Sequence, residues 1–254
     1  MRNIHAFYLL LLLLCVPIKA NSSEVGISVN LHNSQIEGSF DNENEVFIFR
    51  GIPYAKPPIG ELRWQSPVQL SSIPKTINAQ SFKPACMQDE YTTVWYKDVA
   101  ELFGNSRSVF QHVEEVNEDC LYLNIWTNSL DQTSKKPVMV WVHGGADTGG
   151  WSYEPNYLGH HLANKDVVVV SINYRLNIFG FFLHPELSGQ TGNFGLEDEM
   201  MALQWIKDYI SFYGGDPNNI TYFGESAGGA HVSYLMAAPK AKGLFKRGII
   251  QSGA

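Results

Sequence analysis

Short apolar runs alternate with helical repeats along the second half of the chain, from Pro137 onward. Val138 to Val142 and Val167 to Ile172 are nearly continuous apolar runs, typical of strands that are buried on both faces of a sheet. Ile220 to Phe223 and Arg247 to Gln251 are two further strand candidates. These runs predict a mostly parallel sheet.

Two of the segments between these strands have apolar residues at helical spacing, and each predicts a helix. Gly214-Gly215 ends the first helix, and Ala227 to Ala237 predicts a second helix that stops before Pro239. The order strand, helix, strand, helix predicts the α/β class, with helices on both faces of the sheet, right-handed crossovers and a ligand crevice beyond the carboxyl ends of the strands. Within the first helix, Leu196 to Tyr213, the apolar residues at helical spacing are Met200, Leu203, Trp205, Ile206 and Ile210.

The first part of the chain, up to about residue 130, has a different pattern. Short β-type segments such as Val46 to Phe49 lie among many turn residues, including the Pro and Gly of Gly51 to Gly60. This pattern predicts an antiparallel lead-in with long loops. No internal repeat, linker or composition shift divides residues 21–254, so we expect them to belong to one domain.

Residues 1–20 have the pattern of a signal peptide. Arg2 supplies positive charge, Ala6 to Ile18 is an apolar run too short to span a bilayer, and Ala20 is a small residue at a suitable cleavage point. The alternative is a buried N-terminal helix, which would need an amphipathic face that this run lacks. We therefore expect a protein that is secreted or lies in the lumen of the secretory pathway.

This compartment changes the interpretation of the three cysteines. Cys15 lies in the signal peptide, which leaves Cys86 and Cys120 as a pair under oxidising conditions. We expect a disulfide between them, and the alternative is two free thiols. Sequons at Asn21 and Asn219 predict a glycoprotein and fit the same compartment.

Charge and composition indicate which kinds of molecule this protein is not suited to bind. The chain is 44% hydrophobic and 17% charged, which is ordinary for a globular protein. Its net charge is -7, and its 18 Lys and Arg residues are scattered instead of forming a basic stripe. This distribution argues against binding of nucleic acid.

The third predicted strand leads directly into Gly224-Glu225-Ser226-Ala227-Gly228, which has the GxSxG pattern. A serine that points out of a sharp strand-to-helix turn has strained backbone geometry, and glycines two residues to either side let strand and helix pass closely. The amide of Ala227, at the helix N-terminus, would lie beside a developing oxyanion. The alternative is a glycine-rich turn whose serine only caps the helix, but the flanking strand and helix favour a nucleophile.

A second motif, His143-Gly144-Gly145-Ala146, directly follows the strand that ends at Val142. Backbone amides in so small a turn can face a ligand, as in the oxyanion loop of esterases. The alternative is an ordinary tight turn, which the presence of GxSxG on a neighbouring strand disfavours.

Longer motifs extend this pattern, and through them the chain resembles the type-B carboxylesterases, the family that contains carboxylesterases, cholinesterases and the non-catalytic neuroligins. The resemblance covers nearly the whole chain after residue 20. It implies the α/β-hydrolase fold, with residues 21–254 as the N-terminal part of that domain. The matching segments, besides the turn at His143, are FRGIPYAKPP (49–58), EDCLYLNIW (118–126), NYRLNIFGFF (173–182), GNFGLEDEMMAL (192–203) and YGGDPNNITYFGESAGG (213–229).

The resemblance also implies roles for individual residues. Ser226 would attack the ester carbonyl, and the amides of Gly145, Ala146 and Ala227 would stabilise the tetrahedral oxyanion. Glu225 would line the gorge and tune its electrostatics without belonging to the triad.

Other implied features are architectural. They are the disulfide between the two cysteines of the mature chain and two ion pairs, Arg63 with Glu118 and Arg175 with Asp198.

The oxyanion loop departs from the family pattern at two positions. The family usually has a third glycine followed by an apolar or aromatic residue, where this chain has Ala146 and Asp147. An alanine amide can still donate if its backbone geometry allows it. A carboxylate at position 147 would raise the reaction barrier unless it points to solvent, so Asp147→Phe is expected to raise the rate on simple aryl esters. Tyr213 and Asn177, which replace a usual Phe and Gly, are interpreted as neutral.

The 254 residues do not contain a complete triad. In α/β-hydrolases the order is serine, acid, histidine, yet no Asp or Glu follows Ser226 and the single later histidine is His231. His231 lies about 140° around the helix axis from Ser226, so it is interpreted as a structural residue. His160 and His161 are expected on a helix as surface or packing groups, without metal-ligand spacing. The acid and base are expected beyond residue 254, so this stretch alone is expected to be inactive.

The resulting hypothesis is hydrolysis of small-molecule carboxylic esters through an acyl-serine intermediate, with no metal and no cofactor. The rival is a non-catalytic adhesion or binding protein on the same fold, which the intact Ser226 motif disfavours. A lipase-like or cholinesterase specialisation is a third alternative. Trp95, Tyr96 and Phe110 could line a gorge for a cation, but they could equally be packing residues.

Overall fold

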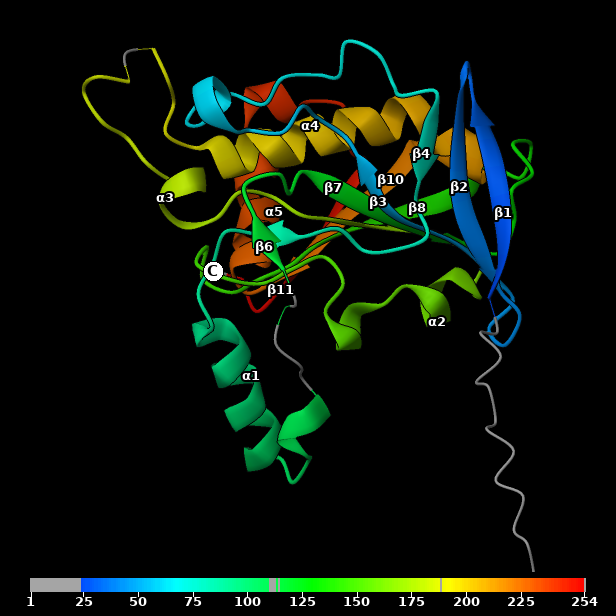
Figure 1. Ribbon diagram of the computed structural model, residues 1–254, viewed down its shortest axis with the longest axis horizontal. Helices are drawn as coiled ribbons and strands as arrows, with labels where there is room; N and C mark the ends of the chain where they lie inside the picture. Colours follow the sequence, from blue (N-terminus) through cyan, green and yellow to red (C-terminus); the bar gives the residue numbers. More distant parts are fainter. Residues whose placement is uncertain (1–23, 110–112, 114, 188, 254) are drawn as a thin grey trace, which may run out of the picture.

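A nine-stranded sheet lies at the centre of the computed structural model, which describes residues 24–109, 113, 115–187 and 189–253. Eight strands follow the order β1-β2-β3-β7-β9-β8-β10-β11, and β4 pairs with β2 beside this path. Figure 1 shows β1 and β2, in blue, at one side of the molecule. The expected signal peptide, the sequon at Asn21 and the aromatic Phe110 lie outside the described residues.

The first half of the sheet is antiparallel, as the turn-rich lead-in predicts. β1 (Glu24–Leu31), β2 (Ser34–Asp41) and β3 (Val46–Pro53) pair in succession, and β3 continues against β7 (Tyr122–Thr127). β3 contains the predicted segment Val46 to Phe49. The short strands are β4 (Thr76–Asn78), β5 (Ala85–Cys86) and β6 (Val116–Asn117), of which the last two form a separate pair.

The second half is parallel, and it confirms the predicted α/β class. β8 (Lys136–Val142) lies between β9 (Val168–Ile172) and β10 (Gly215–Glu225), and β11 (Arg247–Gln251) pairs with β10. All four predicted strands are present, although β10 begins at Gly215 instead of Ile220. The chain leaves β8 toward β9 and returns past β8 to β10, so the loops after β8 and β10 meet at a switch point, where α/β sheets bind ligands.

Helices cover both faces of the sheet. Figure 1 shows α4 (Phe194–Tyr209) along one face and α2 (His160–Ala163) on the other, while α5 (Ala227–Ala237) packs on β10 and β11 beside α4. Within the described residues, no helix has the length and apolar character needed to cross a membrane. The other helical segments are α1 (Tyr91–Leu102), α3 (Asn177–Gly180) and the 3₁₀ turns Gly60–Leu62, Arg107–Val109, Pro155–Tyr157, Ile210–Tyr213 and Pro239–Ala241.

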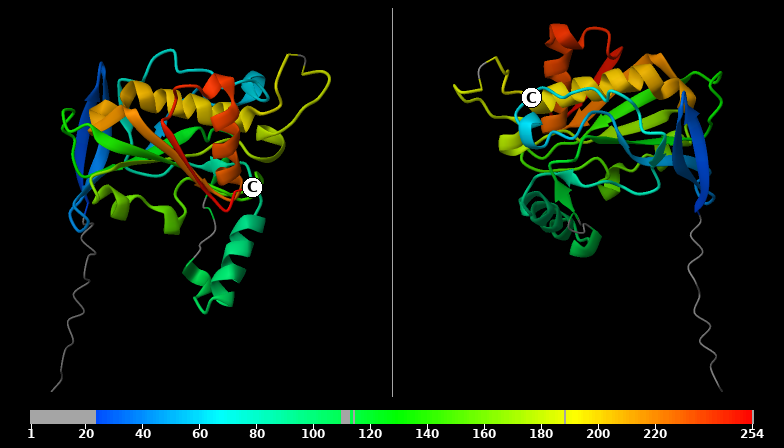
Figure 2. Two further views of the ribbon diagram at one scale, coloured as in Figure 1. Left: turned by 180° about the vertical axis from the view of Figure 1, so that it is seen from behind. Right: turned by 45° about the horizontal axis from the view of Figure 1, so that its top comes forward.

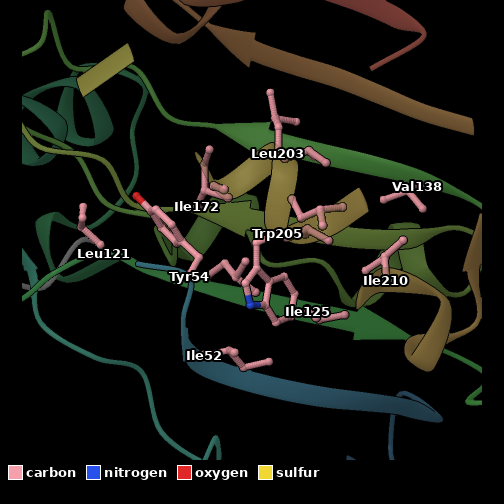
Figure 3. Close-up of a cluster of buried hydrophobic side chains, with 14 of the residues drawn as sticks. Ile52, Tyr54, Leu121, Ile125, Val138, Ile172, Leu203, Trp205 and Ile210 are labelled. Atoms are coloured by element: carbon pink, nitrogen blue, oxygen red, sulfur yellow. The ribbon is translucent and has the colours of Figure 1, made fainter. Parts of the chain in front are cut away.

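The main hydrophobic core lies between the sheet and α4. Apolar side chains of α4 and of the 3₁₀ turn that extends it face apolar side chains of the strands, as Figure 3 shows. Gly214 ends this helical segment in a left-handed conformation with φ 80°, as the paired glycines predict. Burial of this apolar surface fixes α4 against the strands that carry the site. Residues from both sides include Leu203, Trp205 and Ile210 with Ile125, Val138 and Ile172.

Both expected ion pairs are present. Arg63 Nε donates to Glu118 Oε2 at 2.6 Å. Arg175, which is buried, donates to Asp198 through Nε at 2.8 Å and through Nη2 at 2.7 Å. Both pairs are bidentate, so they hold their loops in a defined orientation.

The segment between the two cysteines differs from the expected long loop. Cys86 and Cys120 are joined by the expected disulfide, but residues 91–102 between them form the helix α1. Figures 1 and 2 show α1 projecting from the body of the molecule. Tyr91 is 69% exposed and Trp95 is 50% exposed, so the apolar residues of this segment do not follow a core-facing period that the sequence could reveal.

Candidate active site

Ser226 lies at the junction of β10 and α5, at the N-cap position of the helix, but its side chain makes no capping hydrogen bond. Its backbone has φ 55° and ψ −123°, a conformation that residues with a side chain rarely adopt. The amide of Ser226 donates to the carbonyl of Gln251 in β11 at 2.9 Å, and its own carbonyl accepts from the amide of Ala230 at 3.0 Å. These bonds hold the strained residue between strand and helix.

The glycines of the GxSxG motif have a steric reason. A Cβ on Gly224 would lie 2.6 Å from the carbonyl carbon of Gly228, and a Cβ on Gly228 would lie 2.4 Å from the carbonyl oxygen of Val142. Such contacts are much shorter than any that real Cβ atoms make with backbone. Because both positions lack a side chain, β10, α5 and the end of β8 can meet at Ser226.

The oxyanion loop, residues 143–147, follows β8 and folds back on itself. The carbonyl of Gly145 accepts hydrogen bonds from the amides of Thr148 at 3.0 Å and Gly149 at 3.2 Å. Ala146 and Asp147 both have positive φ, 54° and 61°. Ala146 therefore adopts the backbone conformation that a glycine favours, at a position where the resemblance leads one to expect a glycine.

A cavity of about 250 Å³ joins Ser226 to this loop. Ser226, Gly145 and Ala146 line it, and Ala227 is the first residue of α5 beside them. The first amides of a helix have no partner within the helix, so the amide of Ala227 is a suitable donor to an oxyanion. The other lining residues are Tyr91, Thr92, Trp95, Tyr96, Thr148 and Glu225.

One carboxyl group lines this cavity, and a second lies buried behind its wall. Burial raises the pKa of Glu225, which lines the cavity beside Ser226. Glu154 is fully buried next to Tyr96, and burial raises its pKa to about 7. The Oε2 atom of Glu154 has no hydrogen-bond partner among the described residues. The cavity therefore combines aromatic side chains with groups whose charge depends on pH.

The sequence suggested that the carboxylate of Asp147 lies either unpaired beside the oxyanion or in solvent, and the structure shows a third arrangement. The Oδ1 of Asp147 lies 3.0 Å from Nε2 of His231 in α5, so the carboxylate neither stays unpaired beside the oxyanion position nor simply points to solvent. On its other side, Nδ1 of His231 lies 2.6 Å from Oε1 of Glu199 in α4. The expectation of an uncompensated charge at Asp147 is therefore wrong, because the imidazole of His231 pairs with it.

Sequence reasoning missed the partners of His231. His231 lies in α5, where the helical geometry turns it away from Ser226, and it is buried between two carboxylates. The available signal was that His231 and Glu199 are polar residues on helix faces that are otherwise apolar. Such buried polar residues require partners, which the sequence alone does not name.

No described histidine is placed to activate Ser226. Burial lowers the pKa of His143 to about 4, so this imidazole is neutral, and its Nδ1 lies 2.8 Å from the carbonyl oxygen of Gly144. His160 packs on Trp126 at the other face of the sheet, in agreement with the expected packing role. The described part of the chain also contains no cluster of side chains that could hold a metal ion.

Comparison with known proteins gives the family of this fold and site. The model of the Carboxylesterase family matches residues 26–254. The chain belongs to the carboxylesterase family. Among solved structures, a carboxylesterase of Geobacillus stearothermophilus has a TM-score of 0.76 and 41% identity, over 89% of this chain and 43% of that one. A thermophilic PNB esterase has a TM-score of 0.77 and 38% identity, over 89% and 44% of the two chains.

Curated members of the carboxylesterase family show the same partial coverage. Fumonisin B1 esterase of Sphingopyxis macrogoltabida is 38% identical over 242 residues, which are 93% of this chain and 42% of that protein. Liver carboxylesterase 1 of Mus musculus is 44% identical over 210 residues, 82% of this chain and 36% of its own. Cholinesterase of Mus musculus is 36% identical over 253 residues, 98% and 40% of the two. The chain thus spans about two fifths of the length of these relatives.

Proposed function

We propose that the complete protein containing this chain hydrolyses small-molecule carboxylic esters through an acyl intermediate on Ser226. The observation that carries the proposal is the strained Ser226 at the start of α5, which shares a cavity with the oxyanion loop. A merely structural serine does not require a backbone conformation with φ 55° at this junction. The names of the relatives, which include esterases and carboxylesterases, support the same reaction class.

The reaction would proceed in two halves. The Oγ of Ser226 attacks the ester carbonyl carbon while a base takes the hydroxyl proton, and the carbonyl oxygen becomes an oxyanion to which Gly145, Ala146 and Ala227 donate. Collapse of this intermediate breaks the bond to the alcohol, which leaves with the proton from the base. A water molecule then attacks the acyl-serine in the same way, releases the acid and restores Ser226. Removing one oxyanion donor from such a site costs about 10² to 10³ in rate.

The base and its acid partner are proposed to come from outside these 254 residues. Two observations support this: no Asp or Glu follows Ser226 in the sequence, and His143 and His231 contact other groups, the carbonyl of Gly144 and the carboxylates of Asp147 and Glu199. By the same reasoning, residues 1–254 alone are proposed to be inactive. The complete protein is further proposed to be a secreted glycoprotein, because of the signal-peptide pattern and the sequon at Asn219.

Substitution of Ser226 tests the activity directly. The complete protein is expected to hydrolyse short-chain p-nitrophenyl esters, and Ser226→Ala should lower kcat by about 10⁴ or more, because a triad does not function without its nucleophile. Ser233→Ala is a matched control on the same helix, where the hydroxyl only donates to the carbonyl of Gly229 at 3.4 Å. Equal activity of the wild-type, Ser226→Ala and Ser233→Ala proteins would show that Ser226 is not the nucleophile. A folded, complete wild-type protein without esterase activity would favour the non-catalytic binding protein.

A further inference from the structure

Three charged side chains from three separate elements meet behind the oxyanion loop. Asp147 comes from the loop, Glu199 from α4 and His231 from α5. The imidazole of His231 is 1% exposed and Glu199 is fully buried, whereas Asp147 is 39% exposed. A single imidazole therefore bridges a carboxylate of the core and a carboxylate of the loop.

The two carboxylates keep the imidazole of His231 charged. Burial disfavours the charged imidazole of His231, but the carboxylates of Glu199 and Asp147 outweigh it and raise the pKa of His231 to about 10. The second oxygen of Glu199 accepts a hydrogen bond from the Tyr222 hydroxyl at 2.6 Å. If the cation at His231 were removed, Glu199 would retain only that hydroxyl, and Asp147 would carry an uncompensated charge.

The oxyanion loop depends on how Asp147 is held. Ala146 and Asp147 both have positive φ, which residues with a side chain rarely adopt. The turn therefore needs stabilising contacts with the rest of the fold. The backbone of Asp147 supplies one such contact, because its carbonyl accepts from the amide of Asn177 at 2.7 Å. Its side chain supplies the other, to His231 on the helix that begins next to Ser226.

We propose that His231 is a positioning residue for the oxyanion hole. Its imidazolium holds the carboxylate of Asp147 away from the place where the oxyanion develops, neutralises that charge and fixes the loop relative to Ser226. This proposal rests on the proposed ester hydrolysis. The proposal also explains why an aspartate can occupy position 147, since Asp147 and His231 then act as one unit.

A double-mutant cycle in the complete protein tests this unit. His231→Gln keeps the approximate size of the side chain but removes its charge, so it should lower kcat on a p-nitrophenyl ester by at least about tenfold while KM changes little. Its inhibition by a trifluoromethyl ketone, which forms an oxyanion on the serine, should weaken by a similar factor. Adding Asp147→Asn to His231→Gln removes the uncompensated charge and should restore part of kcat.

The direction in which kcat changes when Asp147→Asn is added to His231→Gln distinguishes a positioning role of His231 from a packing role. If His231 only packs, the double variant will be as slow as His231→Gln or slower, which would overturn the proposal. The matched control is His160→Gln, a partly buried histidine whose Nε2 lies 3.9 Å from Asp41 far from the site, and it should leave kcat unchanged.

The titration of His231 can be measured without substrate, so it tests this proposal independently of the proposed ester hydrolysis. In protein labelled with ¹⁵N-histidine, Asp147→Asn should lower the pKa of His231, whereas His160→Gln should not change it. If the pKa of His231 is the same in Asp147→Asn as in the wild type, the proposed pairing of His231 with Asp147 is overturned, even if the enzyme is active. A wild-type protein with the expected titration but without esterase activity would instead contradict the proposed function and leave the ion-pair array in place.

Discussion

Glu154 shows how a single buried carboxyl group makes the stability of this site depend on pH. It is fully buried, its Oε1 accepts from the amide of Trp151 at 3.3 Å, and it interacts with Tyr96 in the cavity wall. Burial raises its pKa to about 7, above the ordinary value of 4.5. The folded protein therefore binds this proton more tightly than the unfolded chain does, so the stability contribution is complete below pH 4.5 and is lost as pH rises through 7.

Glu154→Gln should remove this pH dependence. The variant is expected to be more stable than the wild type by about 2 to 3 kcal/mol at pH 8, with no difference near pH 4, since one pKa unit corresponds to about 1.4 kcal/mol. Urea unfolding of the complete protein at both pH values measures this, with the exposed Glu61→Gln as control. A Glu154→Gln protein that is equally stabilised, or destabilised, at both pH values would contradict the assignment.

At the scale of elements, the site depends on how closely β8, β10 and α5 approach one another. Gly228 lies where they meet, and a Cβ there would come 2.4 Å from the carbonyl oxygen of Val142 and 2.7 Å from that of His143. Both acceptors belong to the backbone that leads into the oxyanion loop. Neither can move aside as a flexible side chain would, so a side chain at Gly228 must separate the helix from the loop.

Gly228→Ala should therefore damage both the fold and the reactivity of Ser226. The expected loss is about 1 to 3 kcal/mol of unfolding free energy, with a fall in esterase activity larger than the loss of folded protein explains. Gly26→Ala in β1 is the control, because its Cβ would meet only Gln80 Nε2 at an ordinary 3.4 Å. Similar effects of the two substitutions would show that close packing at this junction is not required.

The elements that the sequence revealed are those with local apolar residues and clear stop signals. The predicted bounds of α5 and β11 agree with the structure, because apolar runs and stop signals define them locally. β1 alternates apolar and polar or small residues from Val25 to Leu31, so its strand pattern is present in the sequence although no strand was predicted there. α1 exposes several apolar side chains, so its apolar residues follow no core-facing period. At the site, GxSxG and the glycine turn are local motifs, whereas the contact between His231 and Asp147 joins distant segments and could not be read from spacing.

At the scale of the whole molecule, the described chain brings Ser226 and the oxyanion loop to one cavity. Both lie in residues 143–228, whereas part of the cavity wall comes from α1. The chain spans 36% to 42% of the length of the curated relatives compared above. The central proposal is therefore that Ser226 is the nucleophile of the complete protein, which supplies the base that activates it.

Covalent labelling of the complete protein tests that claim most directly. An alkyl fluorophosphonate reacts with a serine only if that serine is activated and its oxyanion is stabilised, so the label reports both halves of the site together. Mass mapping of the labelled protein is expected to find one phosphonate per chain, on the peptide that contains Ser226, and none after Ser226→Ala. A label on another serine, or a folded complete protein that takes up no label, would contradict the assignment of Ser226 as the nucleophile.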